Sequence, residues 1–162
     1  SRTNVPSIFA VGDVTDRINL TPVAIREAAA FVQTEFHASP TAFDHADVAS
    51  AVFARPPAAS VGLTEADARS RGRVRVFKSA FRPMKNILAG NEQRTLMKLV
   101  VDAANDRVIG VHLAGPEAPE LIQVAAIAVK AGLTKAQWDA TCAVHPTAAE
   151  ELVLMGEPVA EV

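Results

Sequence analysis

A histidine and a glutamate five residues apart form the pair in this sequence best suited to proton transfer. His145 precedes a proline, and Glu150 falls in the first turn of the helix that we expect to follow. Imidazole side chains in general exchange protons near neutral pH, and a neighbouring carboxylate can fix their tautomer. Thr147 and Glu150 also match the S/T-x-x-E capping box. The pattern therefore predicts either an acid/base histidine held by Glu150 or a simple helix cap.

A second place for chemistry is Asp13, which follows Gly12 at the end of a short apolar segment. We expect residues 8–11 to form a buried strand and residues 21–37 to form a helix with Thr21 as its N-cap. In open α/β sheets, a carboxylate beyond a strand end can accept hydrogen bonds from ribose or polyol hydroxyls, and a helix N-terminus favours anions. The alternative is a glycine turn with a solvated aspartate.

Several other kinds of site are disfavoured by composition. The single cysteine, Cys142, rules out an internal disulfide framework, a CxxC pair and a cysteine-rich zinc site, and it fits a reducing cytosol. Cys142 and His145 could form a Cys–His nucleophile, but apolar neighbours favour a buried, inert thiol. The four histidines lack metal-ligand spacing, so we expect no metal. A net charge of −2 and short apolar runs predict neither a nucleic-acid nor a membrane partner.

The remaining elements predict two parts joined near residue 40. Residues 1–40 read as a strand and helix of an α/β domain whose other strands must come from elsewhere. Residues 41–162 predict an α+β domain, an antiparallel sheet with flanking helices, centred on a hairpin of residues 96–101 and 107–113. A helix over 118–131 has too many apolar positions for one core-facing stripe. Another subunit or another part of the same chain must cover its second face.

Four motifs, in this order along the chain, resemble the flavoprotein pyridine nucleotide-disulfide oxidoreductases, and most of all the glutathione reductase family. They are Ser-Ile-Phe-Ala-Val-Gly-Asp at 7–13, Leu-Thr-Pro-Val-Ala at 20–24, the proline pair at 56–57, and His-Pro-Thr-Ala-Ala-Glu-Glu at 145–151. The resemblance covers nearly the whole chain but only the C-terminal third of such enzymes. It implies that residues 1–40 end an FAD-binding domain and that residues 41–162 are a dimerisation domain.

The resemblance further implies a cytoplasmic homodimer that uses FAD and NADPH to reduce glutathione disulfide through a cysteine pair. Asp13 would then accept the ribitol hydroxyl of FAD, and the region of Thr21 would face the flavin pyrimidine. Because the cysteine pair and the nucleotide-binding glycines are missing from these 162 residues, we expect the chain to be a C-terminal fragment that is inactive alone.

By the same resemblance, His145 is the acid/base that reaches the partner subunit's active site, held by Glu150, while Met84 and Glu151 line the glutathione site. Ala29 departs from the pattern, because many glutathione reductases carry there an arginine that binds a glutathione carboxylate. Trypanothione reductases have alanine at this position. The alternatives are therefore a trypanothione, dihydrolipoamide or other disulfide reductase, or a dimerisation module with no enzymatic role.

Overall fold

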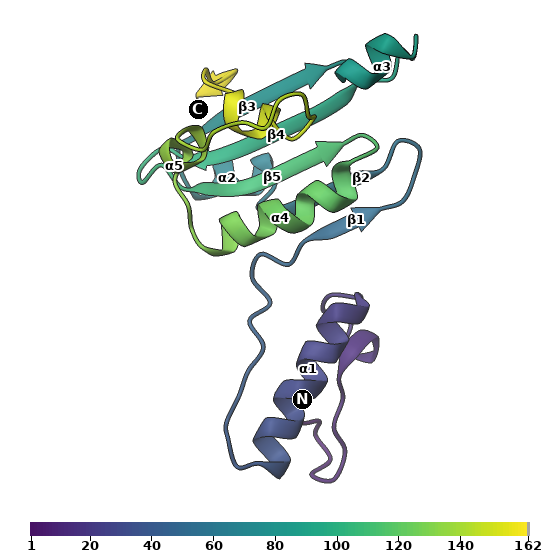
Figure 1. Ribbon diagram of the computed structural model, residues 1–162. Coiled ribbons are helices and arrows are strands. Elements are labelled where there is room, and N and C mark those ends of the chain that lie inside the picture. Colours follow the sequence, from purple (N-terminus) through teal and green to yellow (C-terminus); the bar gives the residue numbers. More distant parts are fainter. Residues whose placement is uncertain (162) are drawn as a thin grey trace. The chain divides into compact units, whose positions relative to one another are not determined.

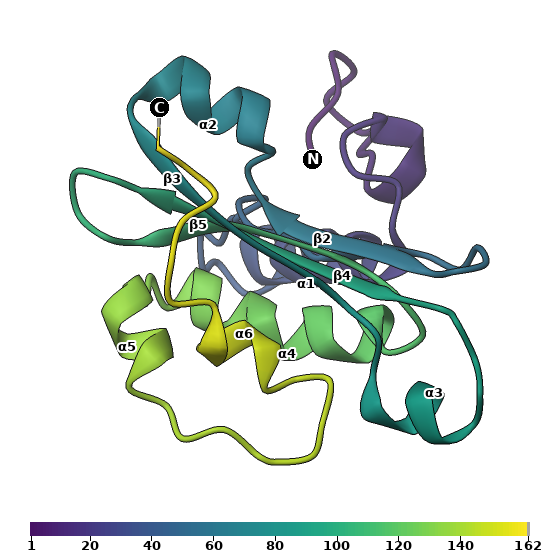
Figure 2. The same cartoon turned by 90° about the horizontal axis from the view of Figure 1, so that it is seen from above.

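The computed structural model describes residues 1–161, which form two compact units that divide between Ala46 and Asp47. The first unit contains a short 3-10 turn and one long helix, whereas the second is built on a sheet with helices on both faces (Figures 1 and 2). The structure divides the chain a little after the linker near residue 40 that composition indicates. That the first unit belongs to an FAD-binding domain stays a prediction.

The first unit is organised around α1, Thr21–Phe36, which follows a 3-10 turn, η1, over Gly12–Thr15. Leu20 is the N-cap of α1, because its carbonyl oxygen accepts the N–H groups of Val23 and Ala24 at 3.0 and 3.1 Å. The prediction that Thr21 is the cap was therefore wrong by one residue: Thr21 is the first helical residue, and a proline follows it.

The apolar segment before this turn does not form the expected buried strand. It makes one isolated bridge, between Arg2 and Phe9, and Ile8 is 54% exposed. Its backbone groups bond instead within a local loop, with the Thr3 N–H donating to the Ile8 carbonyl oxygen at 3.2 Å. A strand needs a neighbouring strand to satisfy its backbone hydrogen bonds. The described part of this unit offers this segment only the single bridge from Arg2. The Phe9 ring packs on Phe31 of α1, with centroids 4.9 Å apart.

The second unit is built on a six-stranded, wholly antiparallel sheet with the order β1-β2-β5-β4-β3-β6. Its strands are β1 (Ser50–Val52), β2 (Ala58–Gly62), β3 (Val74–Phe81), β4 (Thr95–Asp102), β5 (Val108–Ala114) and β6 (Ala160–Glu161). The predicted hairpin is the central pair, β4 with β5, and it is flanked on one side by β3 and on the other by β2. The α+β fold with an antiparallel sheet is confirmed.

Helices lie on both faces of this sheet (Figure 2). They are α2 (Glu65–Arg71), α3 (Met84–Leu88), α4 (Ala118–Lys130), α5 (Lys135–Asp139) and α6 (Glu151–Leu154). The helix α2 lies on one face, where Ala68 packs with Val74, Val76 and Val100. The larger core lies on the other face, between the sheet and α4, α5 and α6. The alternation of side chains along each strand lets one sheet serve both cores.

The larger core is fully closed at the centre of the sheet. Met97, Leu99 and Val111 have no exposed surface, and they meet Ile122 and Ala125 from the inner face of α4. Burial of such side chains stabilises the fold by about 1.5–3 kcal/mol each. The second unit can therefore hold functional loops at its rim on a rigid base.

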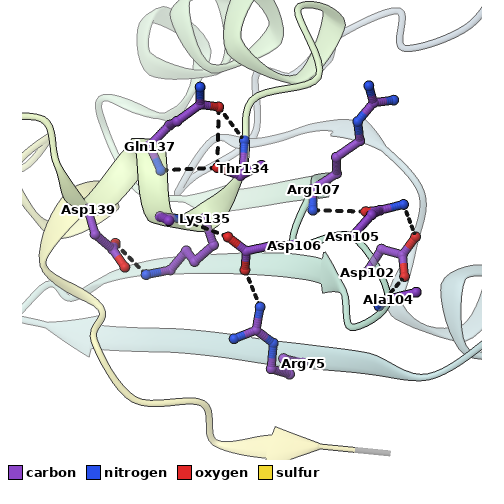
Figure 3. Close-up of polar contacts among 11 residues, drawn as sticks. Arg75, Asp102, Ala104, Asn105, Asp106, Arg107, Thr134, Lys135, Gln137 and Asp139 are labelled. Atoms are coloured by element: carbon purple, nitrogen blue, oxygen red, sulfur yellow. Dashed lines mark hydrogen bonds and ion pairs between the residues drawn. The ribbon is translucent and has the colours of Figure 1, made fainter.

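A polar network ties α5 to the turn between β4 and β5 (Figure 3). The carbonyl oxygen of Asp106 accepts the N–H of Lys135 at 2.7 Å, and the Asp106 carboxylate pairs with Arg75 of β3. The Lys135 side chain is 3% exposed, and its ammonium is paired with Asp139 one helical turn away. Because α5 is the last helix before the loop that carries His145, this network fixes where that loop begins.

None of the helices formed by residues 1–161 is long and apolar enough to cross a membrane.

Candidate functional site

The imidazole of His145 is hydrogen-bonded to a carboxylate from the following turn. Its Nδ1 lies 3.0 Å from Oε2 and 3.2 Å from Oε1 of Glu150. The histidine side chain is 68% exposed, whereas the Glu150 side chain is only 16% exposed. A carboxylate held by the fold that accepts Nδ1–H fixes the ring orientation and leaves Nε2 facing outward, able to exchange protons.

The local turn that brings these two side chains together is built by Thr147. Its hydroxyl donates to the carbonyl oxygen of Val144 at 2.8 Å and accepts the N–H of Glu150 at 3.3 Å. This is the amide half of the predicted capping box, and the helix α6 then starts at Glu151. The N-cap of α6 is Glu150, which makes no side-chain cap hydrogen bond, and its carboxylate contacts the imidazole instead of completing the capping box.

The side chains of Met84, Glu150 and Glu151 line one cleft of about 440 Å³, together with Pro146. Met84 begins α3 and is 50% exposed, so its thioether is available to a ligand. The Glu151 carboxylate is oriented by the hydroxyl of Ser79 in β3, which donates to its Oε2 at 2.8 Å. The structure thus brings these predicted residues together beside His145, on a cleft whose lining also includes the cationic side chains of Arg82 and Lys85.

The two other predicted site residues, Asp13 and Thr21, both lie in the Ser1–Ala46 unit. Asp13 is the second residue of η1, and its exposed carboxylate is accessible to hydroxyl donors. Thr21 is exposed at the first position of α1. Gly12 has φ +72°, and a Cβ there would stand 3.0 Å from the Cβ of Ala24, so the turn lies directly against the helix. The main chain can approach so closely only because position 12 is glycine.

A buried carboxylate beneath this turn, Glu27 of α1, is a feature that sequence inspection missed. It is 5% exposed. Its Oε2 accepts the N–H of Gly12 at 2.7 Å, and its Oε1 lies 2.7 Å from His45 Nε2 and 3.5 Å from an Arg17 guanidinium nitrogen. The only signal in the sequence was a charged residue among apolar ones on the helix face that also carries Val23. The partners are 10 to 18 residues away along the chain and could not be identified from spacing.

The acid stability of the Ser1–Ala46 unit is expected to depend on Glu27. Hydrogen bonds from His45 and then Gly12 hold the pKa of Glu27 below its ordinary value of 4.5, against the opposing effect of burial. The ionised form therefore stabilises the folded unit above that ordinary value, and this contribution is lost as the pH falls through the lowered pKa. NMR signals of residues 1–46 should show that the difference in unfolding midpoint between the wild-type chain and Glu27→Gln shrinks from about pH 6 to pH 3. A constant difference across that range would contradict this role.

The outer face of α4 borders an apolar groove. Val124 and Ile127 are each 65% exposed, and Val144, in the loop before His145, is 70% exposed. The groove of about 500 Å³ lies between α4 and this loop, and Trp138 closes its floor. The described residues of the second unit therefore leave this second face of the helix uncovered.

Cys142 is exposed, so the expectation of a buried thiol was wrong. It lies in a loop at the rim of the apolar groove, where its Sγ is 3.7 Å from the Ala143 carbonyl oxygen. Within residues 1–161, no hydrogen bond joins Cys142 to His145, whose Nδ1 is directed to Glu150 instead. The geometry gives no support to a Cys–His nucleophile. No group of three or more His, Cys, Asp or Glu side chains in the described part of the chain is placed to hold a metal ion.

Comparison with known proteins identifies similarities over both units. Residues 48–155 match the family described as pyridine nucleotide-disulphide oxidoreductase, dimerisation domain. The chain is 54% identical over 156 residues to a glutathione reductase of Burkholderia cepacia, covering 96% of this chain and 35% of that protein. It is 50% identical over 163 residues to the chloroplastic/mitochondrial glutathione reductase of Pisum sativum, covering 100% of this chain and 30% of that protein.

Trypanothione reductases are similar as well. That of Trypanosoma congolense is 46% identical over 160 residues, covering 98% of this chain and 32% of that protein. The chain spans about a third of the length of the curated relatives that it matches.

Proposed function

Because the chain belongs to the pyridine nucleotide-disulphide oxidoreductase family through its dimerisation domain, we propose that it is part of a glutathione-disulfide reductase and supplies its acid/base histidine. The observation that carries the proposal is the hydrogen bond of 3.0 Å between His145 and Glu150, beside the cleft that Met84 and Glu151 line. In the proposed reaction, NADPH reduces glutathione disulfide to two glutathione molecules. The FAD and the cysteine pair for this reaction are bound or supplied largely outside these residues.

The role of His145 follows from the chemistry of a leaving thiolate. A thiol has an ordinary pKa of about 8.5, so an imidazolium within hydrogen-bond distance can protonate the departing sulfur. The neutral ring that results can take a proton from the next attacking thiol. Glu150 holds Nδ1–H, so the proton moves at Nε2, and its charge stabilises the imidazolium that forms in each cycle.

The Ser1–Ala46 unit fits one end of a flavin nucleotide. The glycine at position 12, whose missing Cβ leaves the main chain close to α1, precedes an exposed carboxylate at Asp13 that can accept a ribitol hydroxyl. The N-terminus of α1, at Thr21, is a positive dipole end that suits the partial negative charge on the pyrimidine carbonyl oxygens. When bound, the flavin accepts a hydride from the nicotinamide and passes its electrons to a disulfide.

The proposed assembly is a homodimer that uses the apolar groove beside α4. Exposed Val124 and Ile127 are typical of a helix that packs against a second subunit. Because Val144 lies in the same loop as His145, burial of this groove would also order the loop at the subunit boundary. His145 would then serve the active site of the partner subunit, as the resemblance implies. A cytoplasmic location is proposed from the single cysteine and the bacterial relatives.

A trypanothione disulfide is the second candidate substrate. The exposed Ala29 on α1 supports it, because no cation stands at that position to bind a glutathione carboxylate. The trypanothione reductases of Trypanosoma congolense and Leishmania donovani are 46% and 42% identical to the chain. The higher identities, 54% and 51%, are to glutathione reductases of two bacteria, and this favours glutathione.

A substrate comparison tests the proposal. The protein expressed from its complete gene should oxidise NADPH with glutathione disulfide at a kcat/KM at least about tenfold above that with trypanothione disulfide or lipoamide, a difference of about 1.4 kcal/mol in transition-state binding. The 162-residue chain alone should show no turnover, so it serves as the negative control. Preference for trypanothione disulfide would select the second candidate. No reduction of any disulfide by the complete protein would favour a dimerisation module without an enzymatic role.

A further inference from the structure

The buried carboxylate of Glu27 has no part in the proton chemistry proposed for His145, yet it is one of the few charged side chains with almost no exposed surface. A buried charge is costly unless partners surround it. Each partner of Glu27 comes from a different segment of the Ser1–Ala46 unit: Gly12 from the turn, Arg17 from the loop after it, and His45 from the end of the unit. One side chain therefore joins three segments to α1.

The contact with the turn is the most specific of the three. The Gly12 N–H donates to Glu27 Oε2 at 2.7 Å, and the residue that follows is Asp13. Gly12 has φ +72°, and its carbonyl oxygen accepts the Thr15 hydroxyl at 2.8 Å inside the turn, but the direction of the chain at Asp13 also needs a restraint toward α1. A short charge-assisted hydrogen bond from a helix side chain supplies that restraint. Without it, the turn would be held to α1 by packing.

We propose that Glu27 is a positioning residue of the flavin site, which holds the Gly12–Asp13 turn against α1 so that the Asp13 carboxylate meets a ribityl hydroxyl. This inference rests on the proposed function, since it takes the ligand of Asp13 to be a flavin. It goes beyond that function by assigning a role to a residue that touches no substrate or cofactor. His45 and Arg17 pair with Oε1 of Glu27, the oxygen that does not bind Gly12. There they compensate the buried charge and orient the carboxylate.

Two substitutions separate the hydrogen bond from the charge. Glu27→Gln retains an oxygen that can accept the Gly12 N–H, whereas Glu27→Met has a similar length but accepts no hydrogen bond there. The matched control is Glu35→Met. Glu35 is also on α1 and pairs with Arg2 at 2.8 Å, so the control removes a carboxylate and an ion pair from the same helix without touching the turn.

The test uses the protein expressed from its complete gene, with FAD as the probe. In Glu27→Met the dissociation constant for FAD, measured by flavin fluorescence on the apoprotein, should rise about ten- to hundredfold, as expected when a buried donor loses its acceptor. Glu27→Gln should restore most of the affinity, and Glu35→Met should match the wild type. Amide hydrogen exchange at Gly12, measured without flavin, should be faster in Glu27→Met than in Glu27→Gln.

The outcomes distinguish the two proposals. If the wild type binds FAD and Asp13→Ala weakens that binding, but Glu27→Met binds as the wild type does, the positioning role is overturned while the proposed function stands. Equal weakening in Glu27→Met and Glu35→Met would also overturn it, because the effect would then come from general destabilisation of α1. If the wild type binds no FAD, the proposed function fails and the inference about Glu27 fails with it. Should Glu27→Met not fold, Glu27→Gln with an unprotected Gly12 amide but wild-type flavin affinity would still overturn the proposal.

Discussion

Replacing His145 by glutamine should slow disulfide reduction by about 10²–10⁴-fold while leaving the reduction of the flavin by NADPH unchanged. Glutamine keeps a polar side chain of similar length but cannot be protonated, so only the step that needs a proton at the sulfur is impaired. The two half-reactions can be followed separately by rapid mixing, through flavin absorbance on adding NADPH and through reoxidation on adding glutathione disulfide. The chemistry assigned to Nε2 predicts the loss in the second half-reaction alone.

Two further variants sharpen this experiment. Glu150→Gln should lose less activity than His145→Gln, because an amide oxygen can still accept Nδ1–H while the compensating charge is gone. His37→Gln replaces an exposed histidine in the Ser1–Ala46 unit, and it should behave as the wild type. Equal losses in both half-reactions of His145→Gln would show that the substitution disturbs the assembly and that the acid/base assignment is wrong.

The largest expected effect on stability is at Gly62, where β2 passes close to β5. A Cβ at this position would stand 2.2 Å from the carbonyl oxygen of Ile109, and the residue has φ +75°. Leu63, the next residue, donates its N–H to that same oxygen at 2.8 Å, so the oxygen cannot withdraw without breaking a bond. Gly62→Ala combines the cost of a left-handed backbone with that of forcing two strands apart, about 2–5 kcal/mol in total.

Substitutions at two other glycines of the chain measure the backbone part and the steric part of this cost separately. Gly90 has φ +66° with no atom within 4 Å of its Cβ position, so Gly90→Ala should show the backbone cost alone, about 1–2 kcal/mol. At Gly110 a Cβ would stand 2.2 Å from the Leu63 carbonyl oxygen, which isolates the steric part. Urea unfolding of the 162-residue chain can be followed through its single tryptophan, Trp138, which is 6% exposed. If Gly62→Ala and Gly90→Ala lost the same stability, the close approach of the strands would have no energetic weight.

Much of the second unit could be predicted because its signals are local. The hairpin of β4 and β5 follows from two apolar runs around a polar turn, and α5 follows from the capping box of Thr134 and Gln137, which the structure shows in full. The excess of apolar residues on α4 likewise predicted a second face, and Val124 and Ile127 are exposed there. Each of these features is decided by residues within a few positions of one another.

The errors occurred where a residue's environment depends on distant parts of the chain. Residues 8–11 have the composition of a buried strand, but a strand forms only where a neighbour accepts its backbone bonds. Cys142 has apolar neighbours in sequence, yet its place on a loop at the groove rim leaves it exposed. The pattern of apolar and polar residues indicates which side chains prefer burial. It carries no information on which other elements of the fold are in place to cover them.

The amino-acid sequence by itself determined the central hairpin and the main helices of the second unit and the family resemblance, and it offered the pairing of His145 with Glu150 as one of two alternatives, because these depend on short-range spacing and on motifs. Only the tertiary structure decided that Met84 and Glu151 share a cleft, that Glu27 is buried against Gly12 and His45, and that β2 and β5 meet at two glycines. These pairs of residues are 15 to 67 positions apart (Gly12 to Glu27, Gly62 to Gly110 and Met84 to Glu151 among them). Whether such residues meet is decided by the packing of whole elements, which no local pattern encodes.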